Sequence, residues 1–214
     1  MSRLIDMTAL DLVQLTSSDA PAPGGGSISA LAGSMGAALE EMVSRLTIGR
    51  EKYADAEAEM IKVRDEAMAI KEELLAAVDK DTESFNQYMD ALKLPKNTEE
   101  EKAARRAAMQ EGLKAAALVP IAAAEAAVKV IPLAKTAVKL GNSNAITDAL
   151  VGCMMARSAV LGAALNCRIN LSSIKDEEFT AKLAARVDDV VKKAFEGEKE
   201  VFAVDELTKD FLTF

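Results

Sequence analysis

Hydrophobic residues recur every three to four positions along most of this chain, the period of an amphipathic α-helix. Thr8 with Asp11, and Thr98 with Glu101, have the spacing of capping boxes and mark two helix starts. The pattern predicts helices over residues 8–16, 28–47, 51–92, 98–118, 145–168, 176–196 and 199–212. These elements predict an all-α fold, a single-domain up-and-down bundle with long antiparallel helices.

Prolines and glycines divide the second half of the chain. We expect Pro120 to bend or interrupt a helix, because proline lacks an N–H group, and Pro132 to lie in the first turn of another. Gly141 should end that helix, and residues 142–144 should cap the next. With no repeat, linker or composition break, residues 1–214 are expected to form one domain.

Composition supports a closely packed helical protein. The chain is 50% hydrophobic and only 4% aromatic, and alanine, the best helix former, is abundant. Its net charge is −8, from 26 basic and 34 acidic residues. Nucleic acids are held largely by lysine and arginine, so a nucleic-acid partner is not expected. The chain has no histidine, which excludes histidine bases and imidazole metal ligands, and leaves proton transfer to carboxylates, Lys, Tyr or Cys.

Cys153 and Cys167 lie in one helical stretch, roughly 21 Å apart along its axis, too far for a disulfide. We expect both to be reduced and buried, as in the cytoplasm. The N-terminus shows no sustained apolar segment, so no secretory signal is expected. The apolar tracts 115–130 and 145–167 contain polar or helix-breaking residues and are expected to be core helices, with no membrane partner.

A glycine run, residues 23–27 (PGGGS), precedes the helix expected at 28–47. Backbone amides of glycines at a helix N-terminus can cradle an anion, and bulky ligands can approach bare backbone. The alternative is a tight turn into the helix. On that helix Ser29, Gly33, Gly36 and Glu40 share one face, which predicts very close packing against another helix.

Three further groups are candidates for chemistry. Asp148 and Asn166 are polar residues at the two ends of a small, apolar helical stripe, although Asp148 could simply stabilise its own helix N-terminus. Asp81 and Phe85 share a face of the long helix, although acidic residues there are usually solvated. Lys52 with Tyr53 is a candidate anion contact or an ordinary surface pair.

Two stretches resemble a known family. Residues 18–27 (SDAPAPGGGS), continuing to 47–49 (TIG) and 52–53 (KY), resemble the opening of the formiminotetrahydrofolate cyclodeaminase / methenyltetrahydrofolate cyclohydrolase family. Residues 141–144 (GNSN) with Asp148, followed by 166–171 (NCRINL), are similar to its second signature. Asp81, Phe85 and two proline-containing turns also match, in the right order, over about residues 5–196.

The resemblance implies a free-standing folate enzyme. It would form 5,10-methenyltetrahydrofolate from the 5-formimino compound with loss of ammonia, open the methenyl form with water to 10-formyltetrahydrofolate, or do both. It implies a homodimer with folate sites near the subunit interface, no cofactor and no metal, acting on a tetrahydrofolate derivative with or without a polyglutamate tail.

The roles of individual residues follow from the resemblance and the lack of histidine. Asp81 or Asp148 is expected to be catalytic, moving protons beside the cationic one-carbon unit. The expected substrate-binding residues are Pro23, Gly24, Gly25, Gly26, Ser27, Lys52, Tyr53, Phe85, Asn142, Ser143, Asn144, Asn166 and Arg168. The alternatives are a non-catalytic folate-binding or scaffold bundle of the same family, and a generic helical interaction module.

Overall fold

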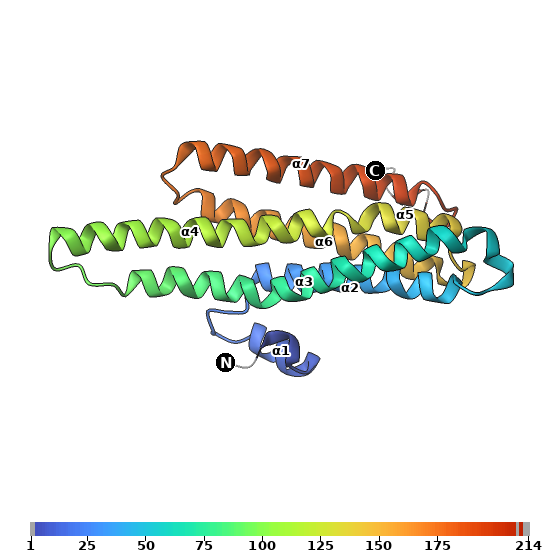
Figure 1. Cartoon of the computed structure of the whole chain (residues 1–214), viewed down its shortest axis with the longest axis horizontal. Helices are drawn as coiled ribbons and strands as arrows, with labels where there is room; N and C mark the ends of the chain where they lie inside the picture. Colours follow the sequence, from blue (N-terminus) through green and yellow to red (C-terminus); the bar gives the residue numbers. More distant parts are fainter. Residues whose placement is uncertain (1–2, 209, 212–214) are drawn as a thin grey trace.

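The computed structural model describes residues 3–208 and 210–211, and in these residues the protein is helical, with no strand. Figure 1 shows long helices lying along one axis. The α-helices are α1 (Ala9–Thr16), α2 (Gly25–Thr47), α3 (Glu57–Leu92), α4 (Glu99–Ala127), α5 (Val130–Leu140), α6 (Ile146–Leu171) and α7 (Glu177–Phe202). Three short 3-10 helices are η1 (Leu4–Asp6), η2 (Glu51–Ala56) and η3 (Ser143–Ala145).

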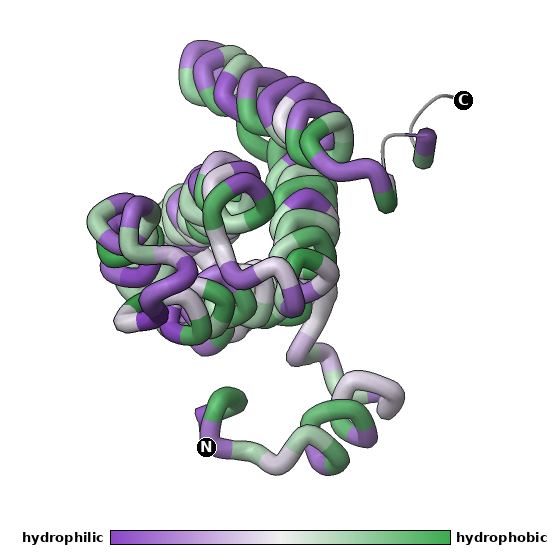
Figure 2. Tube along the Cα trace, turned by 90° about the vertical axis from the view of Figure 1, so that its right-hand side faces the viewer, coloured by the Kyte–Doolittle hydropathy of each residue, from purple (hydrophilic) through white to green (hydrophobic). Residues whose placement is uncertain are grey.

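The long helices pack as an up-and-down bundle, as the hydrophobic period predicts. Helix α2 packs on α3 and α6, α4 packs on α3 and α6, and α7 lies on α6 and α5. Helix α1 stands apart from the bundle, at the end of the N-terminal segment (Figures 1 and 2). This segment is attached through η1, where the Leu4 N–H donates to Asp79 Oδ1 at 2.6 Å.

Small residues let α2 and α6 touch through their backbones. A Cβ at Gly36 would lie 2.7 Å from the carbonyl oxygen of Gly152, and a Cβ at Gly33 would lie 3.1 Å from the Cβ of Ala159. The close packing predicted from the stripe of small residues on α2 is therefore confirmed. It places the N-terminus of α2 beside the C-terminus of α6, and the opposite ends together at the other end of the bundle.

Most helix starts are as expected, but several boundaries differ. Thr98 forms a full capping box with Glu101, and Thr8 and Asp176 cap α1 and α7. Helix α2 begins at Gly25, so the glycine run is its first turn rather than a loop before residue 28. A separate helix over 199–212 is wrong for the described residues, because α7 continues through Gly197 to Phe202 and turns follow. A Cβ at Gly197 would lie 2.7 Å from Ile131 Cγ2, so glycine serves close packing here.

The expected interruption at Pro120 is also wrong, because α4 runs through it to Ala127. Proline cannot donate to the carbonyl four residues earlier, which here is that of Ala116. The side-chain amide of Asn170, on α6, donates to the Ala116 carbonyl at 2.9 Å. A neighbouring helix thus supplies the hydrogen bond that the proline removes.

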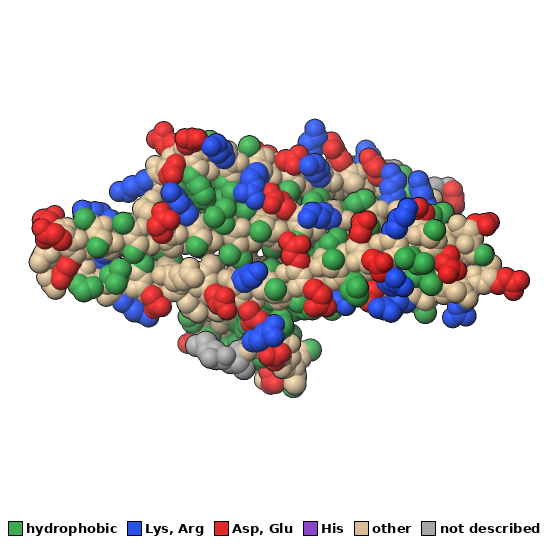
Figure 3. Space-filling model, viewed as in Figure 1, with side chains coloured by type: hydrophobic (Ala, Val, Ile, Leu, Met, Phe, Trp, Pro, Cys, Tyr) green, Lys and Arg blue, Asp and Glu red, His purple; other side chains and the backbone are tan. Residues whose placement is uncertain are grey.

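The apolar tracts lie in the bundle. Within the described chain two stretches, Glu99–Leu140 and Ser143–Leu171, are long and apolar enough to cross a membrane, but 56% and 50% of their most apolar windows are buried in the protein. Core helices of soluble proteins have the same composition. Cys153 and Cys167 are both buried and free. The face seen in Figure 3 carries acidic and basic side chains interspersed, as a solvated surface does.

Candidate functional site

Residues from three of the predicted groups meet where the N-terminus of α2 and the C-terminus of α6 approach α3. We call Gly24–Gly26, Ser27, Asp81, Phe85 and Asn166 the glycine-turn cluster. Ser27 Oγ donates to Asp81 Oδ2 at 3.0 Å. A Cβ at Gly26 would overlap the Asp81 carboxylate, and one at Gly25 would lie 3.0 Å from Asn166 Nδ2. The glycines therefore let two polar side chains approach the helix N-terminus.

This arrangement changes the interpretation of the glycine run. The expected anion cradle already faces a carboxylate of its own chain, that of Asp81, which lies where the helix dipole favours negative charge. Burial raises the pKa of Asp81, while hydrogen bonds from the hydroxyl and the backbone N–H of Ser27 act in the opposite direction. Asp81 can therefore keep its proton to a higher pH than an ordinary aspartate, as a proton-transfer group requires.

A pocket of about 340 Å³ opens beside Asp81. Its walls are the 21–24 segment, one face of α3, the middle of α4 and the last turns of α6. Phe85 and Tyr88 offer flat apolar surfaces, and Asn166 and Asn170 offer amides. The pocket has the mixed lining typical of a small-molecule site. Pro23 itself is buried behind the turn.

A second group of predicted residues meets at the opposite end of α2. We call Lys52, Tyr53, Asn142 and Ser143 the tyrosine cluster. Asn142 fixes it: its backbone N–H donates to Thr47 Oγ1 at 2.8 Å, and its side-chain amide donates to the Leu46 carbonyl at 3.0 Å. This joins η3 to the end of α2 and places Ser143 against the Tyr53 hydroxyl.

Tyr53 is the most perturbed polar group of this cluster. Its hydroxyl oxygen accepts the backbone N–H of Ser143 at 3.0 Å and lies 3.0 Å from Ser143 Oγ. Hydrogen bonds from Ser143, and then Lys52, lower the pKa of Tyr53 to about 8. A phenol that ionises this close to neutrality can exchange protons under physiological conditions.

The two clusters are separated within one chain. Helix α2 runs from Gly25 to Thr47, so the clusters lie roughly 33 Å apart along it. Asp148, in the first turn of α6, and Asn144 lie at the end of the tyrosine cluster. Arg168 joins neither cluster: it pairs with Asp188 of α7 at 2.6 Å. The structure therefore divides the thirteen expected binding residues and the two carboxylates into two clusters and one outlier.

Some residues of the first pocket were not expected from the sequence. Tyr88 and Asn170 line it together with Thr82 and Ile169. Tyr88 follows Asp81 by two helical turns, and Asn170 follows Asn166 by one, so helical spacing from the expected residues could have identified both. Thr47, which anchors Asn142, belongs to the 47–49 stretch that carries the family resemblance, but its role as an anchor was not expected.

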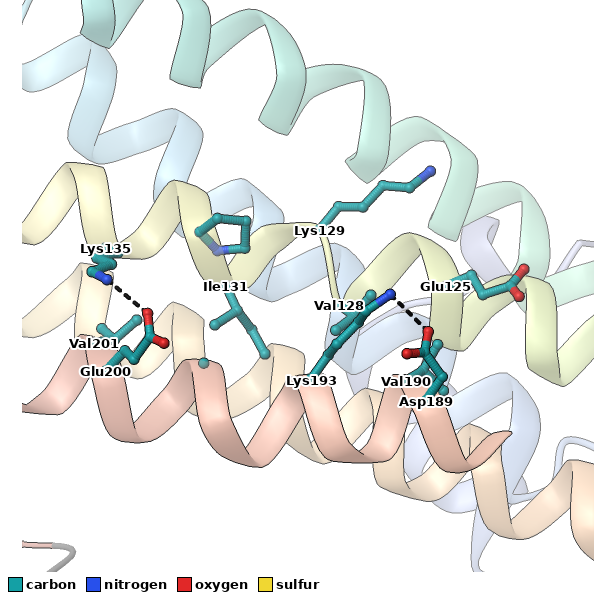
Figure 4. A pocket seen from close by; sticks show the side chains of 12 residues that line it. Glu125, Val128, Lys129, Ile131, Lys135, Asp189, Val190, Lys193, Glu200 and Val201 are labelled. Carbon is teal, nitrogen blue, oxygen red and sulfur yellow. Dashed lines mark hydrogen bonds and ion pairs between the residues drawn. The ribbon is translucent and has the colours of Figure 1, made fainter. Parts of the chain in front are cut away.

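A roomier groove lies elsewhere, between α7 and the junction of α4 with α5 (Figure 4). Its volume is about 610 Å³ and none of the expected site residues lines it. Lys135 pairs with Glu200 and Lys193 with Asp189 along its rim, so most of its charges are already neutralised. Within residues 3–208 and 210–211, no group of three or more Cys, Asp or Glu side chains is arranged to hold a metal ion.

Comparison with known proteins gives one consistent family. A family model described as formiminotransferase-cyclodeaminase matches residues 8–189. The chain is 40% identical over 177 residues to a methenyltetrahydrofolate cyclohydrolase of Methylorubrum extorquens, covering 83% of this chain and 85% of that protein. It is 38% identical over 183 residues to the formimidoyltransferase-cyclodeaminase of Gallus gallus, covering 86% of this chain but only 34% of that protein.

A solved structure shares the fold. The crystal structure of a formiminotetrahydrofolate cyclodeaminase from Thermotoga maritima superposes with a TM-score of 0.83, covering 96% of this chain and 98% of that one, at 24% sequence identity. The same bundle therefore occurs in a protein whose sequence has diverged widely from this chain.

Proposed function

The chain belongs to the formiminotransferase-cyclodeaminase family, and from this premise we propose that it makes or opens the 5,10-methenyl bridge of tetrahydrofolate. The two reactions are closure of 5-formiminotetrahydrofolate with loss of ammonia and hydrolysis of the methenyl form to 10-formyltetrahydrofolate. The observation that carries the proposal is the pocket beside Asp81, in which a partly buried carboxyl group, two aromatic rings and two amides converge.

Both reactions pass through a cationic carbon between two nitrogens. In hydrolysis, water attacks that carbon and gives up a proton; in closure, N10 attacks and loses one while ammonia takes one. The carboxyl group of Asp81 supplies negative charge beside the cation and can exchange a proton. Phe85 and Tyr88 offer surfaces on which the flat pterin can stack.

A homodimer would complete the site. The exposed side of the α2–α6 pair is apolar: Met35, Met42 and Leu46 on α2 continue into Val151, Leu165 and Ile169 on α6. Met35 is 51% exposed, Leu165 66% and Ile169 72%. A contiguous apolar face of this kind on a soluble bundle marks an interaction surface. Because Ile169 also lines the pocket, the face borders the site directly.

We place a second copy of the chain on this face, with a two-fold axis lying in the interface and running across the helices. That symmetry carries the glycine-turn cluster of one protomer to the tyrosine cluster of its partner. It brings the acidic Asp81 of one protomer opposite the cationic Lys52 of the other. A two-fold axis along the helices would instead place each cluster beside the same cluster of the partner. The two clusters, far apart in one chain, then form two complete sites.

The decisive assay follows the methenyl chromophore. Starting from the 5-formimino substrate, the enzyme should make the chromophore appear; starting from the methenyl substrate, it should make the chromophore disappear faster than the spontaneous rate. The protein should also elute as a dimer when its mass is measured by light scattering. Binding of tetrahydrofolates without any change in either rate would contradict the proposal and favour a non-catalytic folate-binding bundle.

A further inference from the structure

We propose that Tyr53 is a proton-transfer residue of this enzyme, its phenolate held by Ser143 and Lys52. The inference rests on the proposed function for the reaction it serves, but the hydrogen bonds that support it are independent of that function. It adds a group that neither of the two carboxylates supplies: a base that can be formed near neutral pH in a chain without histidine.

The geometry favours the ionised form of the phenol. The Tyr53 oxygen accepts the backbone N–H of Ser143 at 3.0 Å, and Ser143 Oγ, also at 3.0 Å, can donate a second hydrogen bond to the ionised oxygen. Lys52 Nζ donates to Ser143 Oγ at 3.3 Å, which leaves the serine proton free to turn toward Tyr53. The neutral phenol can donate to Ser143 Oγ at 3.0 Å or to Asn142 Oδ1 at 3.4 Å, but it loses the first of these when the serine hydroxyl donates. Donors to the oxygen stabilise its negative charge, so the cluster favours the phenolate.

The charges around the phenol act in the same direction. Lys52, from η2, lies 5.0 Å from the centre of the Tyr53 ring. The residues that contact the hydroxyl from the η3 side, Asn142 and Ser143, are uncharged. Lys52 is thus the charged group that the described structure places against Tyr53, and the lowered pKa noted above agrees with this arrangement.

One shuttle of this kind serves both reactions. In hydrolysis, water forms a C–O bond to the methenyl carbon and its proton passes to the Tyr53 phenolate. As the C–N5 bond breaks and the carbonyl forms, the phenol returns this proton to N5 and the hydroxyl proton leaves to solvent. In closure, N10 forms the C–N bond and its proton passes to Tyr53, which returns it to the amino group that leaves as ammonia.

The first test reads the phenol without using activity. The chain has two tyrosines and no tryptophan, so phenolate absorbance can be titrated against a clean background. The difference between the wild-type protein and Tyr53→Phe should show one group ionising near pH 8. Lys52→Met should move that transition toward the ordinary tyrosine value of about 10. Lys192→Met, an exposed lysine on α7, is the matched control and should not move it.

The second test is kinetic. Tyr53→Phe should lower kcat by about 100-fold or more, the usual size of a general acid–base contribution. The wild-type rate above the spontaneous background should rise with pH as the phenolate forms, and this rise should be absent in Tyr53→Phe. Lys52→Met should shift the rise to higher pH while the folded protein stays intact, which a purely structural role would not produce.

The outcomes separate the two proposals. A Tyr53 transition near pH 10 in the wild-type protein would overturn the inference. So would a Tyr53→Phe enzyme with wild-type kcat and an unchanged pH profile, even though the proposed function would then stand. A wild-type protein inactive on both substrates would overturn the proposed function, and the role of Tyr53 with it, whatever the phenol titration shows.

Discussion

Two adjacent glutamates on α2 should respond to pH with opposite signs. Glu40 is fully buried against α6, and neither of its carboxyl oxygens has a hydrogen-bond partner among the described residues. Burial raises the pKa of Glu40 well above its ordinary value. Glu41 pairs with Lys71 of α3 at 2.8 Å and with Arg45, one turn later on α2, at 2.7 Å. The hydrogen bond from Lys71 is the main cause that lowers the pKa of Glu41.

The sign of the Glu40 contribution follows from proton linkage. The folded protein keeps the Glu40 proton at pH values where the unfolded chain, with a pKa of about 4.3, has released it. The stability that this proton contributes is complete below that value and is lost as the pH rises toward the folded pKa, at up to about 1.4 kcal/mol per pH unit. For Glu41 the contribution is present above the unfolded pKa and is lost as the pH falls.

The perturbation is Glu40→Met, which keeps the side chain's length and removes its polar atoms. The variant should be more stable than the wild-type protein by about 1–3 kcal/mol near neutrality, because an unpaired polar group is no longer buried. The measurement is urea unfolding between about pH 5 and pH 8, with Glu41→Gln as the neighbouring control. The loss of stability with rising pH should vanish in Glu40→Met and persist in Glu41→Gln. An unchanged pH slope in Glu40→Met would refute the reasoning.

Three other predictions concern the same core. Gly152→Ala should destabilise the bundle by about 1–3 kcal/mol by overpacking, because the new Cβ would overlap the Glu40 carboxyl. In a double-mutant cycle, adding Glu40→Ala should restore much of the lost stability. Arg157→Met should cost about 3–5 kcal/mol in urea unfolding, because it leaves a buried glutamate of α7 unpaired. Burial raises the pKa of Cys153 and of Cys167, so thiol reagents should label neither until the protein unfolds. Labelling of the folded protein as fast as that of an exposed thiol would contradict this.

Local signals in the sequence were enough for the helices and most of their starts. Thr98 and Glu101 act only on each other and on nearby backbone, so their spacing specified the capping box. Pro120 was interpreted wrongly because the group that offsets its missing N–H, the amide of Asn170, lies on another helix. Spacing along one helix cannot show which side chain a distant helix will bring to a free carbonyl.

The candidate site shows the same difference between local contacts and contacts from distant helices. Gly26, Ser27 and Asp81 were expected to act together, and the structure joins them because glycine gives the carboxylate room. Tyr53 and Ser143 were each expected to bind substrate, and the structure adds a direct contact between them. The helix expected over 28–47 already places the glycine run and Tyr53 at its opposite ends. The sequence could not show that Asn142 and Ser143, from a distant segment, would join Tyr53 there, because that contact depends on tertiary packing.

Mixing inactive variants tests most directly whether each site is built from two chains. Asp81→Asn and Asp148→Asn alter carboxylates at opposite ends of the bundle, and each variant alone should turn over the methenyl chromophore far more slowly than the wild-type enzyme. If the two subunits are unfolded together in equal amounts and refolded, half of the dimers are hybrids with one intact site in two. Activity should then return to about a quarter of the wild-type value. A mixture no more active than the separate variants, or full turnover by both variants alone, would contradict a site shared between protomers.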